Sequence, residues 1–116
     1  MQVEVSTDHN IEGSEQLTSQ VVAEVTATLS RFADQLTRVE VHLSDENADK
    51  GGIADKRCMI EARPAGLQPV AVTDHGATVE DACSGALRKL TSVLDTRFGK
   101  LSNRKGGDTL RRAEES

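Results

Sequence analysis

The side chains most capable of chemistry in this sequence are basic residues gathered near its carboxy-terminal end. Residues 88–116 hold 8 Lys and Arg against 4 Asp and Glu, whereas residues 1–87 hold 6 against 15. The whole chain has a net charge of -5, so the basic excess is local. Such an excess predicts an anionic partner for this end of the chain. Each nucleic-acid phosphate neutralised there would release a counterion, so binding would weaken steeply with salt.

The histidines form no pattern typical of a metal site or a catalytic site. His9, His42 and His75 come from three separate segments, and no CxxC or HxxxH spacing accompanies them. Asp–His pairs at 8–9 and 74–75 fall at the ends of predicted strands, where turn-forming residues are expected. No convergent polar cluster suitable for an enzyme can be named. We therefore expect no catalysis, no metal, no cofactor and no small-molecule substrate.

Length and composition favour one domain in the cytoplasm. A chain of 116 residues is long enough to bury a single core. No apolar run approaches the ~20 residues that span a bilayer, and the amino terminus has neither the basic nor the apolar region of a secretory signal. Cys58 and Cys83 lie in apolar periodic segments, which predicts free buried thiols in a reducing compartment. Phe32 and Phe98 are the only aromatic residues, so the stacking platforms of single-strand binders are missing.

The elements that must position the basic residues are indicated by the periodicity of apolar side chains. Alternating apolar and polar residues predict strands over 1–7, 39–44, 56–63 and 69–74. Apolar residues at spacings of three and four predict an amphipathic helix over 15–32. The acidic, glycine-containing stretch between the second and third strands has no period and predicts a loop joining two antiparallel strands.

A long second helix is predicted to begin at Thr78. Two carboxylates stand in its first turn, where the helix dipole favours negative charge. We expect the helix to end near Gly99 or one turn later. The predicted organisation is a single domain over 1–101 followed by a disordered basic tail over 102–116.

The resulting order, β-α-β-β-β-α, predicts an α/β (α+β) fold. Its architecture would be a two-layer sandwich in which two helices cover one face of a four-stranded sheet. The other sheet face would carry a mixed-sign lattice of cross-strand neighbours. These outward residues are Glu40, His42, Arg57, Glu61 and Arg63.

Several blocks of the sequence resemble the short hibernation-promoting factor and ribosome-associated inhibitor family, which includes ribosomal subunit interface and sigma-54 modulation proteins. The blocks are MQVEV, LSRF, RVEVHLS and TVEDACSGALRKLTSVLDTRFGKL, and the likeness covers about residues 1–105. The resemblance implies a fold similar to double-stranded-RNA-binding domains. It also implies binding to small-subunit RNA in the decoding region of the ribosome, so that translation is blocked in stationary phase or stress.

The resemblance also implies a basic RNA-facing strip over the two helices. Lys89 falls where the family has a lysine in its final helix, and Lys100 falls in its basic end segment. The first helix departs from the family pattern because it carries Glu24 and neutral residues where relatives have lysines and arginines. The predicted RNA-binding residues are Arg88, Lys89, Arg97, Lys100, Arg104, Lys105, Arg31 and Arg38.

Two other interpretations remain open at this point. The basic residues of the last helix could form an ordinary solvated face. Alternatively, the acidic first helix and the net charge of -5 suggest a protein-interaction module that kept this fold and no longer binds ribosomes. Charge reversal at Lys89 and Arg97 is expected to abolish ribosome binding only if those residues contact RNA.

Overall fold

The computed structural model describes residues 1–8, 15–45 and 56–106, the last seven of them by their backbone alone. The predicted order β-α-β-β-β-α is confirmed, with one short 3-10 helix, η1, added after the first helix. The elements are β1 (Gln2–Thr7), α1 (Glu15–Thr28), η1 (Ser30–Phe32), β2 (Leu36–Asp45), β3 (Lys56–Pro64), β4 (Val70–Gly76) and α2 (Val79–Gly106).

The four strands form one mixed sheet in the order β1-β2-β3-β4. Strand β1 pairs parallel to β2, because α1 carries the chain back across the sheet between them. Strands β2, β3 and β4 are antiparallel neighbours, as successive strands joined by short connections are expected to be.

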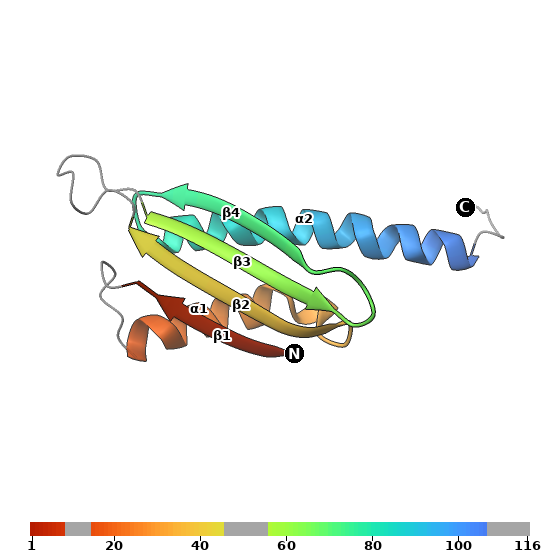
Figure 1. Cartoon of the computed structure of the whole chain (residues 1–116), viewed down its shortest axis with the longest axis horizontal. Helices are drawn as coiled ribbons and strands as arrows, with labels where there is room; N and C mark the ends of the chain where they lie inside the picture. Colours follow the sequence, from red (N-terminus) through yellow and green to blue (C-terminus); the bar gives the residue numbers. More distant parts are fainter. Residues whose placement is uncertain (9–14, 46–55, 107–116) are drawn as a thin grey trace.

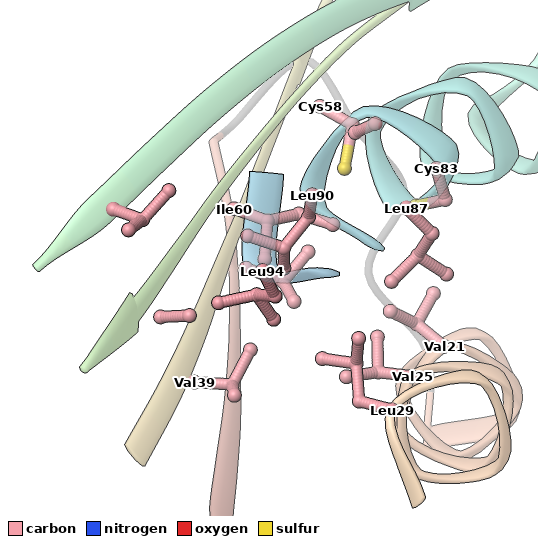
Figure 2. Close-up of a cluster of buried hydrophobic side chains, with 14 of the residues drawn as sticks. Val21, Val25, Leu29, Val39, Cys58, Ile60, Cys83, Leu87, Leu90 and Leu94 are labelled. Carbon is pink, nitrogen blue, oxygen red and sulfur yellow. The ribbon is translucent and has the colours of Figure 1, made fainter. Parts of the chain in front are cut away.

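Both helices lie on the same face of this sheet, as Figure 1 shows, with α1 behind β1 and β2 and α2 behind β3 and β4. The strand residues that point toward the helices are buried, including Val39, Val41 and Ile60. Val25 of α1 and Leu90 of α2 meet them in the core (Figure 2). The two-layer α+β architecture is therefore confirmed.

In the part of the chain that the structure describes, no helix covers the opposite face of the sheet (Figure 1). The strand register sets Glu4, Glu40 and Glu61 side by side across β1, β2 and β3. Arg38 lies 2.6 Å from Glu4 and 2.9 Å from Glu40, and Arg63 lies 3.6 Å from Glu61. The predicted mixed-sign lattice is present, and the cations offset the repulsion between neighbouring carboxylates.

Helix α2 packs unusually closely against the end of β4. A Cβ on Gly76 would come within 2.7 Å of the Asp81 Cβ, and a Cβ on Gly85 within 1.8 Å of an Asp74 carboxylate oxygen. The helix begins where the sequence predicts, because the Thr78 hydroxyl accepts a hydrogen bond of 3.0 Å from the Asp81 main-chain N–H. Glycine at two positions thus allows strand and helix to approach each other.

Helix α2 continues further than the sequence suggests. Gly99 was expected to end it, but a terminating glycine normally adopts a left-handed conformation, and Gly66 is the glycine with positive φ in the described part of the chain. The helix therefore passes through Gly99 to Gly106 and takes in residues 102–106, which the sequence assigned to the tail. The remaining predicted tail and the loop predicted between the second and third strands fall at 107–116 and 46–55, outside the described residues.

Among the described residues, neither helix has the length and apolarity needed to cross a membrane.

Candidate RNA-binding surface

The described basic residues of α2 lie on two different sides of the helix. Lys89 reaches toward β4, where its Nζ donates a hydrogen bond of 2.9 Å to the main-chain oxygen of Thr73 and lies 3.5 Å from Asp74. Arg97 reaches the same side and donates a 2.6 Å hydrogen bond to the main-chain oxygen of Gln68. Both side chains therefore help to hold α2 against β4 and the turn before it.

Arg88 lies on the side of α2 that faces α1. It is exposed and lines a groove between the two helices. Within the described part of the chain it makes no hydrogen bond or ion pair, although its charge helps to stabilise the Asp74 carboxylate. Among the predicted RNA-binding residues whose side chains the structure describes, Arg88 has the charge that is most available to a partner.

Arg31, in η1, is bound to α2 through Asp95. Two guanidinium nitrogens lie 2.7 and 2.8 Å from the two carboxylate oxygens, a bidentate arrangement. The guanidinium carbon also lies 4.5 Å from the centre of the Phe32 ring, and that ring lies 5.7 Å from the ring of Phe98. The charge of Arg31 is therefore matched by a carboxylate within the protein.

Arg38 is not brought together with the other predicted residues. It stands in β2 between the inward-facing residues Leu36 and Val39, on the sheet face away from the helices, and pairs there with Glu4 and Glu40. The sequence predicts the second strand from Val39, whereas β2 begins at Leu36 and therefore takes in Arg38.

The basic residues beyond Gly99 occupy the last turns of α2. Lys100, Arg104 and Lys105 belong to the helical backbone, and their side chains lie outside the described set. This end of α2 extends past the sheet in Figure 1. Three basic residues are thus carried on a helical projection.

Helix α1 carries no Lys or Arg between Glu15 and Thr28. The groove between it and α2 has a volume of about 630 Å³. Its lining residues are Glu24, Thr28, Ser84, Leu87, Arg88, Thr91, Ser92 and Asp95. Sequence reasoning missed this groove, although the departure of Glu24 from the family pattern was a signal that pointed to it.

Glu24 and Ser84 join the two walls of this groove. The Ser84 hydroxyl donates a 3.0 Å hydrogen bond to a carboxylate oxygen of Glu24. Thr91 turns its hydroxyl to the main-chain oxygen of Leu87, one turn earlier in α2, at 2.7 Å. The groove therefore combines a fixed carboxylate, hydroxyl groups and the guanidinium of Arg88.

Asp74 is held in its charged form beside α2. The main-chain N–H of His75 donates a hydrogen bond of 2.9 Å to its carboxylate. This hydrogen bond and, to a smaller extent, the charges of Lys89 and Arg88 hold the pKa of the carboxyl below its usual value. Partial burial acts in the opposite direction. The position and charge of Asp74 are thus explained by its local structure.

The two cysteines are free and buried, as the sequence predicts. Cys58 of β3 and Cys83 of α2 face each other in the core (Figure 2), and a hydrogen bond between the thiols together with burial raises the pKa of Cys58. The described residues contain no group of three or more side chains able to hold a metal ion. His9 lies outside them.

Comparison with solved structures finds the same fold in several proteins, of which two are described here. The N-terminal domain of Protein Y from Thermus thermophilus superposes with a TM-score of 0.66 at 22% sequence identity, over 84% of this chain and 99% of that domain. A ribosomal subunit interface protein from Coxiella burnetii gives a TM-score of 0.67 at 11% identity, over 85% of this chain and 99% of that one. Comparison with curated protein sequences finds no match.

A protein-family model provides the assignment that these low identities cannot. The model described as sigma 54 modulation protein / S30EA ribosomal protein matches residues 4–102, from within β1 through every later strand and helix to the last turns of α2. The chain therefore belongs to the sigma 54 modulation protein / S30EA ribosomal protein family, whose members are ribosome-associated.

Proposed function

We propose that this protein is a non-catalytic cytoplasmic factor that binds RNA of the small ribosomal subunit in the decoding region. By occupying that region it blocks translation during stationary phase or stress. The observation that carries the proposal is the family match over residues 4–102, which takes in both helices of the candidate surface.

The proposed contact surface is the exposed part of α2, from Arg88 at the groove to the projecting end of the helix. Arg88 supports this assignment because it is exposed and has no ion-pair partner in the described part of the chain. Lys100, Arg104 and Lys105 add positive charge along the same helix. Side chains of this type bind phosphate and 2′-hydroxyl groups of folded RNA, which are recognised by shape more than by sequence.

Lys89 and Arg97 can contribute to this surface while keeping their bonds to the protein. An arginine has five N–H donors and a lysine three, whereas Arg97 uses one on Gln68, and Lys89 is held by Thr73 and Asp74. Arg31 contributes less, because Asp95 neutralises it. Arg38 is not part of the proposed contact surface, because it lies on the opposite face of the sheet and pairs there with Glu4 and Glu40.

Sedimentation with ribosomes through sucrose gradients tests the proposal. The test variant replaces Arg88, Lys100 and Arg104 with Gln, and its matched control replaces Arg38, Arg57 and Arg63 of the uncovered sheet face with Gln. Both triple variants remove three positive charges, so a difference between them depends on position and not on net charge. Arg88 is preferable to Lys89 and Arg97 for this purpose, because those two also hold α2 against the rest of the fold.

We expect the wild type and the control to sediment with small subunits at about 50 mM salt and the test variant to remain at the top of the gradient. In a salt titration, log affinity is plotted against log salt concentration. The slope of this plot should become shallower by about 0.7–0.9 for each phosphate contact removed. Equal binding by both triple variants would contradict the assignment to α2. Failure of the wild type to sediment would remove ribosome binding itself.

The second candidate is a protein-interaction module of the same fold. The observations in its favour are the absence of Lys and Arg from α1 and the neutralised Arg31. Under this alternative the charge variants of α2 leave partner binding intact, and the protein stays free of ribosomes at every salt concentration.

A further inference from the structure

The groove between α1 and α2 differs from a phosphate-binding surface in its chemistry. Its charged groups are Glu24, Arg88 and Asp95, and Asp95 is already paired with Arg31. One carboxylate and one guanidinium therefore remain for a ligand. The volume of about 630 Å³ falls within the range of about 300–1,000 Å³ that is usual for small-ligand sites.

The polar groups of the groove are partly fixed and partly free. The bond from Ser84 fixes the carboxylate of Glu24, which keeps further lone pairs because an ionised carboxylate has about four acceptor positions. Thr28 and Ser92 line the groove and make no hydrogen bond with another described side chain. Leu87, buried beneath them, supplies an apolar contact.

We propose that this groove binds a single unpaired guanosine nucleotide of a folded RNA. The Glu24 carboxylate accepts the N1–H and N2–H₂ donors of the base, Arg88 binds the phosphate, and the hydroxyls of Thr28 and Ser92 bind the ribose. Guanine is the base whose pairing edge offers two adjacent donors to the two oxygens of a carboxylate. Adenine and cytosine offer one amino group there, and uracil offers one ring N–H.

This inference rests on the proposed RNA partner and gives α1 a role in contacting it. A helix with Glu24 and hydroxyl residues in place of lysines is poorly suited to hold phosphate, because its charge repels that group. The same side chains suit a base edge and a ribose, which present hydrogen-bond donors. The two helices thus divide the contact, with α2 providing the positive charge and α1 the base reader.

The test uses the full ¹⁵N-labelled chain, titrated to millimolar concentration with GMP, AMP, CMP, UMP or inorganic phosphate and followed by amide chemical shifts. We expect GMP to shift the amides of Thr28, Ser84, Arg88 and Ser92 and to bind at least about fivefold more tightly than AMP, the lower end for a bidentate base contact. Inorganic phosphate should affect only the neighbourhood of Arg88.

Two variants separate the base contact from a general charge effect. Glu24→Gln keeps an acceptor for Ser84 and should abolish the preference for GMP over AMP. Glu61→Gln, on the uncovered sheet face, removes the same charge and should leave that preference unchanged. Equal shifts with GMP and phosphate, or a preference that survives Glu24→Gln, would overturn the proposal.

The outcomes for the groove and for ribosome binding are independent. A wild type that binds ribosomes but shows no selective response to GMP would remove the nucleotide site and keep the proposed function. A GMP response from a protein that never sediments with ribosomes would keep the site and remove the ribosomal partner.

Discussion

Asp74 is a carboxyl group whose ionisation is tied to the fold. It accepts from the His75 main chain, lies 3.5 Å from Lys89 and rests against the Cα of Gly85. Its pKa is lowered in the folded protein, so the folded state favours the ionised carboxyl more than the unfolded state does. The stabilisation is present above the ordinary pKa of 3.8 and is lost as the pH falls through the lowered value.

We expect Asp74→Asn to reduce the thermal stability of the protein at neutral pH and to have a progressively smaller effect as the pH falls below 3.8. The reason is that protonation of Asp74 in the wild type removes the same charge as the substitution. Thermal unfolding of both proteins in a pH series between about 6 and 2 checks this expectation. A difference in midpoint that stays constant across the series would show that charge on Asp74 does not stabilise the fold.

Arg31 and Arg88 show why a residue type alone does not define a binding residue. Both are exposed arginines near the groove, but only Arg31 has a bidentate carboxylate partner among the described residues. The sequence showed where the basic residues were. It could not show which of them were paired, because Arg31 and Asp95 are 64 positions apart.

Among the secondary-structure elements, the contact of β4 with α2 depends on glycine at position 85. A Cβ there would lie 1.8 Å from a carboxylate oxygen of Asp74 and 3.3 Å from its Cβ. Helix propensity alone favours alanine by about 1 kcal/mol. Close packing opposes that preference, since forced overpacking costs about 1–3 kcal/mol.

We therefore expect Gly85→Ala to destabilise the protein by about 1–2 kcal/mol and to be close to neutral when Asp74→Ala is also present. Gly99→Ala is the matched control in the same helix, because nothing lies within 4 Å of its added Cβ, and it should stabilise by up to about 1 kcal/mol. Denaturant unfolding of five proteins measures these differences: the wild type, Gly85→Ala, Asp74→Ala, the double variant and Gly99→Ala. If Gly85→Ala lowers the free energy of unfolding equally with and without Asp74→Ala, the destabilisation does not come from contact with the Asp74 side chain.

The contact between η1 and α2 gives a prediction of increased binding. Asp95→Asn releases Arg31 from its carboxylate partner and makes its charge available beside Arg88. We expect the variant to bind ribosomes more tightly at low salt. If Arg31 gains one phosphate contact, the slope of log affinity against log salt should become steeper by about 0.7–0.9. The variant should lose less than about 1 kcal/mol of stability, because the ion pair is about half exposed. Unchanged affinity and salt dependence would show that the RNA does not reach η1.

For the molecule as a whole, apolar periodicity was sufficient to predict the order and the layers of the fold. Alternation in β2 and three-four spacing in α1 each reflect one buried face, which a sequence displays directly. The prediction that the last helix ends near Gly99 or one turn later was too short, since α2 continues to Gly106. Glycine is a frequent helix terminator, but a glycine without left-handed φ continues the helix. The groove was missed because its walls come from two helices whose relative placement depends on the core.

Lys89 and Asp74 have a further effect, which concerns how copies of the protein behave at high concentration. Strand β4 is at one margin of the sheet, and outermost strands template intermolecular pairing through their unsatisfied main-chain groups. Two such groups are already engaged here, the Thr73 oxygen by Lys89 and the His75 N–H by Asp74. Polymerisation through this margin is thereby disfavoured, and copies of the protein are expected to stay dispersed at high concentration.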